Sequence, residues 1–511
     1  MKKIASGYRL IFGYLGIFLA VTGVIILLPL LLLVVPEYRN DSVYVINFLI
    51  PGLATLLTGI ALYVLLLVKR EKAQLKKHQD SILLVLIWLV AILVSAVPFI
   101  MTGKMSVTES IFESTSGYAS VGLTRLPLEM YDSHIFTFYR AVLQFFGGVG
   151  LVLIVTSAIS DRYGLKLYTA EGHNDRLIPN LGKSARIILS MYVGFIILGM
   201  GALMIAGVNW FDALTHSISS IATGGFSSKA NGMAGYSGNQ MAIEIITCVL
   251  MILGATNFLL HFMLLLGRFK KVGKDIEIKT FGIIVLIFVP LMFLAFFTSH
   301  IVMNGVLTDQ TFSVGESFRY GTFTFISCIT TTGYSNVPAG ITIPSVAFLL
   351  LAICNVIGGG MGSTAGGVKF YRIGIACKSY YWTLRAKLSP KRFIYPTYIT
   401  RYGDLKEIHK DDSNEAFGYI LLYVLVVIVG AFLVSVLGSY DFGSSLFEFS
   451  TALSGTGLSN GITAGANGFA AANNAVLWVL NVGMFAGRLE ILAIYYAIFR
   501  IARDIFRKET I

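Results

Sequence analysis

The chain has 511 residues, of which 56% are hydrophobic and only 13% are charged, and its mean hydropathy is +0.76. Because soluble proteins usually carry about 25% charged residues, this composition excludes an ordinary water-soluble protein. The formal net charge is +12, but the basic residues follow a membrane pattern described below, which argues against a nucleic-acid partner.

Apolar runs of roughly 20 or more residues recur along the chain, which is typical of membrane-spanning helices. The first run is too long for the core of a signal peptide, and no small-residue cleavage site follows it. We therefore interpret it as the first span. The expected spans lie near residues 10–36, 43–68, 81–103, 133–159, 184–208, 238–267, 280–306, 342–368, 413–438 and 471–499.

Lysine and arginine are distributed unequally between the two sides of these spans. The segments on the side of the N-terminus hold 32 of them and the opposite segments hold six, with Arg488 left inside the last span. Positively charged loops stay on the cytoplasmic side. The sequence therefore predicts a multi-pass protein of the cell (cytoplasmic) membrane with both termini in the cytoplasm.

Four short loops share one pattern, a glycine followed by a bulky apolar residue and then Ser or Thr. A hydroxyl residue precedes each glycine by six positions, a bulky residue by four and a small residue by three. A cluster of small residues follows in the next apolar run. The loops are Gly122-Leu123-Thr124, Gly225-Phe226-Ser227, Gly333-Tyr334-Ser335 and Gly457-Leu458-Ser459, and the clusters are Gly147-Gly148, Gly254-Ala255, Gly358-Gly359-Gly360 and Gly483.

Self-similarity of this kind indicates one supersecondary unit used several times about a common centre. The alternative, that small residues merely let membrane helices pack closely, accounts for the later clusters but not for the shared loop positions. We expect an all-α membrane protein with four tandem helix–pore loop–helix repeats in a pseudo-fourfold arrangement around one pore, plus two N-terminal transmembrane helices. The expected division is 1–80 for the extra spans and a cytoplasmic linker, 81–183, 184–277 and 278–412 for repeats 1 to 3, and 413–511 for repeat 4 with the C-terminus.

These loops have the composition that a cation pore requires. Irregular backbone at membrane depth is tolerated where it is buried in protein or lines water, and successive carbonyl oxygens can replace the hydration shell of a cation. Glycine permits the backbone angles that a carbonyl ring needs, and a short preceding helix would point its negative C-terminal end at the ion. The loops contain no carboxylate, which favours carbonyl coordination, as for K⁺, over an acidic ring.

The sequence resembles the Trk/Ktr/HKT superfamily of potassium transporters, most closely the bacterial Trk-type potassium uptake subunit. The resemblance covers essentially the whole chain, and the segments that carry it are residues 114–118 (STSGY), 331–335 (TTGYS) and 358–369 (GGGMGSTAGGVK). It implies that the filter glycines bind K⁺ as the transported ion, that no organic cofactor is held, and that the protein is a homodimer bound to a separate cytoplasmic nucleotide-binding regulatory subunit. A serine in place of the first filter glycine goes with Na⁺ preference in plant relatives, whereas this chain has Gly122.

The resemblance assigns three sets of site residues. The K⁺ filter is expected at Ser120, Val121, Gly122, Thr223, Gly224, Gly225, Thr331, Thr332, Gly333, Gly455, Thr456 and Gly457, although Val121 and Gly455 depart from the Thr-rich pattern. The filter is supported by Leu123, Thr124, Phe226, Ser227, Tyr334, Ser335, Leu458 and Ser459. The gate comprises Gly358, Gly359, Gly360, Gly362, Ser363, Thr364, Gly366, Gly367, Lys369 and Arg488, with an intramembrane gating loop at 357–367.

The glycine-rich segment 358–367 also matches the GxGxxG/A form of dinucleotide sites. That function needs a preceding strand and a βαβ unit, whereas this segment interrupts an apolar helix. A broken helix at membrane depth is more typical of an ion site or a movable barrier. Arg488 is a charge within a span and is therefore a functional candidate; Glu490 is two residues away and points to another face of a helix. Lys369 either snorkels to the cytoplasm or holds the broken helix.

Nine residues before the filter glycines stand Glu113, His216, Thr324 and Glu448. They could attract cations or brace the filter, and their mixed chemistry favours bracing. The four cysteines, Cys248, Cys328, Cys354 and Cys377, have no metal or disulfide spacing. Two other functions remain as alternatives: an ion-coupled secondary transporter, against which the same-direction repeats argue, and an intramembrane enzyme, against which the scattered histidines argue.

Overall fold

The structure is a computed structural model that describes residues 4–5, 7–68, 71–72, 79–150, 181–303, 306–338, 341–389, 397–463 and 472–506. Residues 151–159 of the fourth expected span, and the predicted linker that follows them, lie outside the described residues. Within the described part, helices dominate and three small sheets lie between them. The sheets are a parallel pair, β1 (Ile4–Ala5) with β2 (Glu71–Lys72); the antiparallel order β4-β3-β5, from β3 (His300–Met303), β4 (Val306–Thr311) and β5 (Ile341–Thr342); and the hairpin β6 (Tyr398–Arg401) with β7 (Asp404–Glu407).

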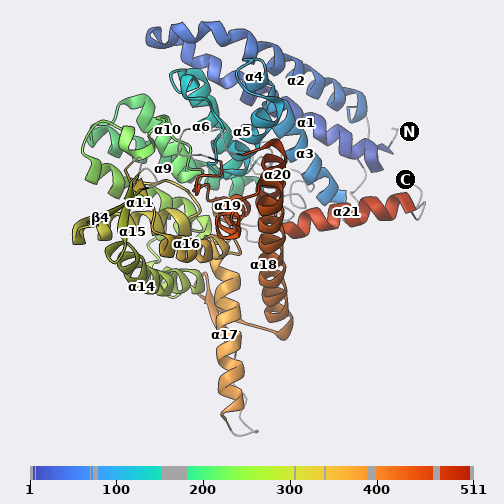
Figure 1. Ribbon diagram of the computed structural model, residues 1–511. Coiled ribbons are helices and arrows are strands. Elements are labelled where there is room, and N and C mark those ends of the chain that lie inside the picture. Colours follow the sequence, from blue (N-terminus) through green and yellow to red (C-terminus); the bar gives the residue numbers. More distant parts are fainter. Residues whose placement is uncertain are drawn as a thin grey trace.

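The two extra N-terminal spans form a tight helical hairpin, drawn in dark blue in Figure 1. Gly16 packs against the Gly59 carbonyl and Gly23 against that of Gly52, so no Cβ would fit at these positions. Close approach of backbones at small residues is the usual way in which membrane helices associate. The hairpin consists of α1 (Gly7–Leu27), η1 (Leu28–Val34), η2 (Pro36–Tyr44) and α2 (Val45–Leu66).

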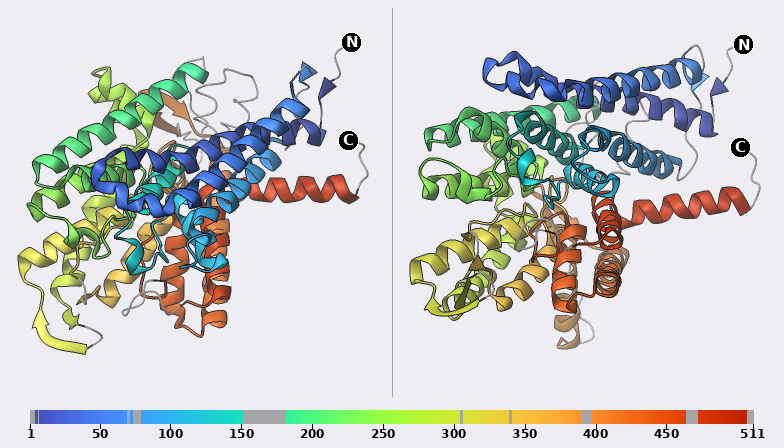
Figure 2. Two further views of the ribbon diagram at one scale, coloured as in Figure 1. Left: turned by 90° about the horizontal axis from the view of Figure 1, so that it is seen from above. Right: turned by 45° about the horizontal axis from the view of Figure 1, so that its top comes forward.

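Four units of the same construction follow. Each has an outer helix, a short inner helix that ends at a filter loop, and a second helix that returns (Figures 1 and 2). Repeat 1 contains α3 (Gln79–Ser95), α4 (Val97–Ile100), α5 (Val107–Ala119), η3 (Leu128–Met130) and α6 (His134–Val149); repeat 2 contains α9 (Leu181–Ile205), α10 (Trp210–Ile221), η4 (Gly232–Gly235), α11 (Gln240–Ala255), α12 (Phe258–Leu265) and α13 (Phe269–Val272). Repeat 3 contains α14 (Ile276–Phe297), α15 (Val314–Ile329), α16 (Ser345–Ile357) and α17 (Phe370–Lys387); repeat 4 contains α18 (Lys410–Gly438), α19 (Phe442–Ser454), α20 (Asn474–Arg488) and α21 (Ile491–Phe506).

The short inner helices α5, α10, α15 and α19 have 13, 12, 16 and 13 residues. At about 1.5 Å per residue they are shorter than the roughly 30 Å hydrocarbon core of a bilayer, so they enter the membrane without crossing it. Each begins with a side chain that accepts a hydrogen bond from a backbone N–H of its first turn, which fixes where it starts. These caps are Ser106, Asn209, Ser313 and Asp441.

The second helix of each repeat ends or breaks close to a glycine of its small-residue cluster or to Gly487. The α11–α12 pair is bent by 106° and the α20–α21 pair by 99°, so the runs 238–267 and 471–499, expected as single spans, are each two helices. The helix α6 ends at Gly150 and α16 at Gly358, both with positive φ. Among the described residues, six helices are long and apolar enough to span a membrane, or up to eight if each bent pair is one span.

In repeats 1, 2 and 4 the same close contact lies beside the break. Gly147, Gly254 and Gly487 each pack against the carbonyl oxygen of the residue four before the filter glycine of the same repeat, where a Cβ would overlap. In the fourth repeat it is Gly487, and not the expected Gly483, that makes this contact; Gly483 packs against Phe449 instead. The returning helix therefore lies directly on the end of the short helix, where it ends or bends.

The beginning of α1 and the end of α21 lie side by side. The Tyr8 hydroxyl donates to Asp504 Oδ2 at 3.1 Å, and both ends of the chain lie on one side of the molecule in the two views of Figure 2. Helix α17 extends from the body of the protein in Figure 1.

Candidate ion pathway

The four filter loops adopt the same backbone conformation. Position −2 relative to each filter glycine has φ of 52°, 49°, 54° and 81°, and the filter glycine itself has φ of 88°, 73°, 88° and 83°. Two left-handed residues separated by one other residue turn the chain sharply, which is strained for residues with a Cβ. The residues at −2 are Ser120, Thr223, Thr331 and Gly455, and the glycines are Gly122, Gly225, Gly333 and Gly457.

The filter glycines close a ring. Each packs against the carbonyl oxygen of the residue just before the filter glycine of the next repeat, so closely that a Cβ would overlap that oxygen. The contacts run around the molecule without a gap: Gly122 to Gly224, Gly225 to Thr332, Gly333 to Thr456, and Gly457 to Val121. The tertiary structure thus brings the twelve predicted filter positions together from four segments far apart in sequence.

Two buried carboxylates brace the loops in the same way. In repeat 1, Glu113 accepts bonds from the Thr124 hydroxyl at 3.0 Å and the Arg125 N–H at 2.8 Å. In repeat 4, Glu448 accepts bonds from the Ser459 hydroxyl at 2.8 Å and the Asn460 N–H at 2.9 Å. Both side chains are fully buried. The geometry matches bracing rather than attraction of cations at a pore mouth.

Repeats 2 and 3 differ at this position. His216 pairs with the Thr247 hydroxyl at 2.9 Å and packs against the rings of Tyr236 and Tyr334. Thr324 is buried, and its hydroxyl has no hydrogen-bond partner among the described residues. Position −9 therefore holds a carboxyl group that accepts hydrogen bonds from the loop in repeats 1 and 4, and an imidazole packed among aromatic rings in repeat 2.

Arg140 links repeats 1 and 2, a role that the count of basic residues on each side of the membrane did not reveal. It pairs with Glu113 at 2.7 Å, donates to the Ser227 carbonyl at 3.1 Å and lies 4.0 Å from the centre of the Phe226 ring. Only 1% of Arg140 is exposed. A charged residue 18 positions after Gly122, inside an apolar run, was the sequence signal that could have identified it.

Similar contacts join the other repeats. Arg319 of α15 pairs with Glu244 of α11, with Nε at 2.8 Å, and Asn336 donates to the same carboxylate at 3.0 Å. Tyr334 donates its hydroxyl to the Phe226 carbonyl at 3.1 Å. Arg125 donates to the Thr463 carbonyl of repeat 4 at 3.2 Å.

The glycine-rich segment 358–369 lies against the inner ends of the filter loops. The Gly366 N–H donates to Thr331 Oγ1 at 2.9 Å, and Gly366 packs directly against the Ser454 carbonyl. Thr364 Oγ1 lies 3.1 Å from Thr223 Oγ1 and 2.9 Å from the Gly254 carbonyl. The predicted gate residues are thus attached to repeats 2, 3 and 4 at once.

Two basic side chains hold this segment. Arg488 donates to the Thr364 carbonyl at 3.5 Å, to the Gly148 carbonyl at 3.3 Å and to the Gly147 carbonyl. Lys369 Nζ donates to the Ala365 carbonyl inside the loop, which matches the holding role rather than snorkelling. Glu490 pairs with Arg372 at 3.0 Å.

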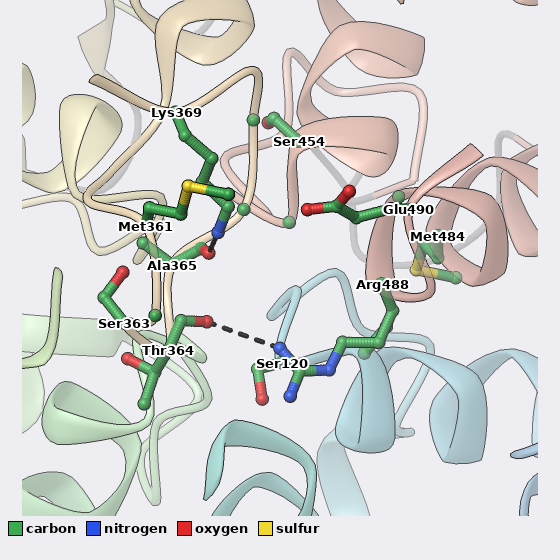
Figure 3. A pocket seen from close by; sticks show the side chains of 16 residues that line it. Ser120, Met361, Ser363, Thr364, Ala365, Lys369, Ser454, Met484, Arg488 and Glu490 are labelled. Carbon is green, nitrogen blue, oxygen red and sulfur yellow. Dashed lines mark hydrogen bonds between the residues drawn. The ribbon is translucent and has the colours of Figure 1, made fainter. Parts of the chain in front are cut away.

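A cavity of about 40 Å³ separates the filter loops from the glycine-rich segment. Figure 3 shows Ser454, at the end of α19, above this space and Ser120 of the first filter loop below it, with Lys369 and Arg488 approaching from different elements. Because one water molecule needs about 10–15 Å³ of such a volume, the cavity has room for a few water molecules. This is a narrow space rather than a wide channel.

Three comparisons with known proteins agree with this architecture. The TrkH family, described as cation transport proteins, matches residues 47–504. The chain belongs to the TrkH family. It is 30% identical over 443 residues to the Trk system potassium uptake protein TrkH of Salmonella typhimurium, covering 83% of this chain and 86% of that protein. It is 27% identical to an uncharacterized cation transporter of Methanocaldococcus jannaschii over 94% of this chain and 93% of that protein.

The fold of this TrkH-family chain is also that of a solved relative. The crystal structure of the potassium transporter TrkH from Vibrio parahaemolyticus matches with a TM-score of 0.79 and 26% identity, covering 96% of this chain and 98% of that one. The prediction of an all-helical, multi-pass membrane protein of the Trk type is confirmed. The Salmonella and Methanocaldococcus relatives are transporters and not enzymes.

Proposed function

We propose that this protein carries K⁺ into the cell, down its electrochemical gradient, through the ring formed by Gly122, Gly225, Gly333 and Gly457. The observation that carries the proposal is the closed sequence of contacts between each filter glycine and the carbonyl before the next one. Relatives named as potassium uptake proteins and a potassium transporter of the same fold support K⁺ as the ion.

The chemistry of the loops favours a weakly hydrated monovalent cation. Backbone carbonyls and hydroxyls surround the ring, and the four short helices end at it, so that their negative ends stabilise a cation there. The nearest carboxylates, Glu113 and Glu448, are used in bonds behind the loops. The twelve filter positions would coordinate or shape the ion path, and the bulky and hydroxyl residues that follow would anchor it.

In this proposal the segment 357–367, with Lys369 and Arg488, forms the gate. The segment lies beside the filter loops and is attached by hydrogen bonds to repeats 2 and 3 and, through Arg488, to repeat 4. Opening would require these bonds and those of Arg488 to break together. A partner that pulled on α17, which directly follows the segment, could supply the necessary force.

Rb⁺ uptake into proteoliposomes tests both parts. Wild type should show uptake that K⁺ competes, Gly333→Ser should reduce it, and deletion of residues 360–366 should increase it. Gly282→Ser is the matched control, because a Cβ at Gly282 meets nothing within 4 Å. Absence of Rb⁺ flux, or equal flux in Gly333→Ser and wild type, would contradict the four-loop pore and favour an ion-coupled solute carrier.

The remaining proposals concern the assembly. The resemblance supports a homodimer with a separate cytoplasmic nucleotide-binding subunit, and we propose that the basic linker after α17 and exposed aromatic residues of α17, Tyr380 and Tyr381, face such a partner. We further propose that both termini are cytoplasmic and that the chain holds no organic cofactor and binds no nucleic acid. Light scattering of the purified protein would measure the oligomeric state.

A further inference from the structure

The four −1 positions of the filter are chemically unequal. They are occupied by Val121, Gly224, Thr332 and Thr456, and their carbonyls are the oxygens against which the filter glycines pack. At three of them a side chain fills the space behind the loop. At Gly224 there is none, and the space is filled by Gln144, whose amide atoms a Cβ on Gly224 would overlap.

Gln144 comes from helix α6 of repeat 1 and reaches across to repeat 2. Its Nε2 donates to the Gly224 carbonyl at 2.6 Å, and the side chain is fully buried. The amide oxygen at its other end has no hydrogen-bond partner among the described residues. Because an unpaired buried amide oxygen destabilises a fold, stability alone does not account for glutamine here.

Repeat 3 has a comparable residue with a different contact. Asn355 of α16, also fully buried, accepts a hydrogen bond from the Thr456 hydroxyl at 2.8 Å. It thus fixes the side chain at position −1 of repeat 4 and leaves the carbonyl to the ring. Three residues before Gly254 and Gly487 the chain has the apolar Met251 and Met484. Amides and thioethers therefore alternate around the filter.

From this geometry we infer that Gln144 is a specificity-determining residue, which fixes the Gly224 carbonyl within the filter ring. The inference rests on the proposed potassium function. Selectivity among cations depends on the number and the field strength of coordinating carbonyls and on how freely they move. Gly224 has the least restrained backbone of the four −1 residues, so without Gln144 its carbonyl can move to fit a smaller ion.

Removal of the amide should therefore change selectivity more than transport. In Gln144→Leu, the Na⁺ concentration that halves Rb⁺ uptake should fall by roughly 2–10-fold, the range expected for one hydrogen bond, while Rb⁺ uptake persists. Gln144→Glu nearly keeps the shape but replaces the amide donor with a carboxyl group, and it should also change Na⁺ competition. Met251→Leu, at the matching place in repeat 2, should leave Na⁺ competition unchanged.

A pair of substitutions tests whether a Cβ on Gly224 would overlap the Gln144 amide. Gly224→Ala alone should abolish most uptake, because its Cβ overlaps the amide, and adding Gln144→Ala should restore it. Thermal melting of each variant in detergent separates unfolded protein from altered selectivity. Unchanged Na⁺ competition in both Gln144→Leu and Gln144→Glu, or an equal change in Met251→Leu, would overturn the inference; absence of Rb⁺ uptake in wild type would instead overturn the proposed function.

Discussion

At the scale of single residues, two glycines with nearly the same φ differ in how much room surrounds them. Gly455 and Gly457 have φ of 81° and 83°, but the nearest atoms to a Cβ on Gly455 are 3.8 Å away, whereas a Cβ on Gly457 would overlap the Val121 carbonyl. The three other repeats have Ser or Thr in the place of Gly455. A side chain is therefore tolerated at position −2 and excluded at position 0.

Gly455 and Gly457 support a prediction in which one substitution serves as the control for the other. Gly455→Ala should fold and retain most Rb⁺ uptake, at a cost of about 1 kcal/mol for a left-handed alanine, whereas Gly457→Ala should lose nearly all uptake. Uptake per mole of reconstituted protein is the measurement. Equal loss in the two variants would mean that the positive φ, and not the contact between repeats, makes the filter glycine necessary.

The buried pair of Glu113 and Arg140 supports a second prediction. Removal of one partner from a buried ion pair leaves an uncompensated charge and costs about 3–5 kcal/mol, so Glu113→Ala and Arg140→Ala should each lower the melting temperature strongly. The double variant should be less destabilised than the sum of the two. Additive losses in such a cycle would show that the pair is not coupled.

At the scale of elements, the glycine-rich segment functions as a unit because its bonds reach three repeats. Its alternative, a dinucleotide loop, requires a sheet, and the segment instead connects helices α16 and α17 within the helical body. The hydroxyl groups of Ser363 and Thr364, at the centre of the segment, differ in the residues to which they donate hydrogen bonds. Thr364 bonds to the Ile221 and Gly254 carbonyls, whereas Ser363 bonds only to Gly360 O of the same segment among the bonds described.

Thr364→Val should therefore loosen the segment and raise basal Rb⁺ uptake by roughly 10-fold, because a hydrogen bond contributes about 0.5–1.5 kcal/mol and 1.4 kcal/mol corresponds to a factor of ten. Ser363→Ala removes a hydroxyl of the same kind without detaching the segment and serves as the control. Uptake without any regulatory subunit is the measurement. A decrease in Thr364→Val would contradict the gate.

At the scale of the whole molecule, the start of α1 and the end of α21 lie next to each other. This agrees with the orientation predicted from the basic residues, in which both termini are on the cytoplasmic side. Cys377 is exposed on α17, on the side predicted to be cytoplasmic. Asp309 lies on β4, which comes between α14 and α15 in the chain, on the side predicted to be external. Cys248, Cys328 and Cys354 are buried or partly buried.

A membrane-impermeant maleimide should therefore label Cys377 only after cells are permeabilised. In a Cys377→Ser background, an added Asp309→Cys should be labelled in intact cells. The Cys377→Ser variant alone measures background from the other cysteines. Labelling of Cys377 in intact cells would reverse the predicted orientation.

Much of this fold could be read from the sequence because membrane helices and repeats leave strong local patterns. The apolar runs, the four glycine loops and the resemblance to the Trk type all rest on residues near one another in the chain. The bends at Gly254 and Gly487 could not be predicted in this way, since an apolar run through a bend has the same composition as a straight span. Each bend lies beside a glycine that packs against the carbonyl of another helix.

The sequence by itself determined the membrane environment and the repeat, and it predicted the filter glycines, because hydrophobic length and backbone freedom are local properties. Only the tertiary structure decided which distant residues meet. Glu113 with Arg140, Gln144 with Gly224, Arg372 with Glu490, and Arg488 with the gate segment join positions between 27 and 124 residues apart. Their pairing depends on how the four repeats pack together and not on sequence spacing.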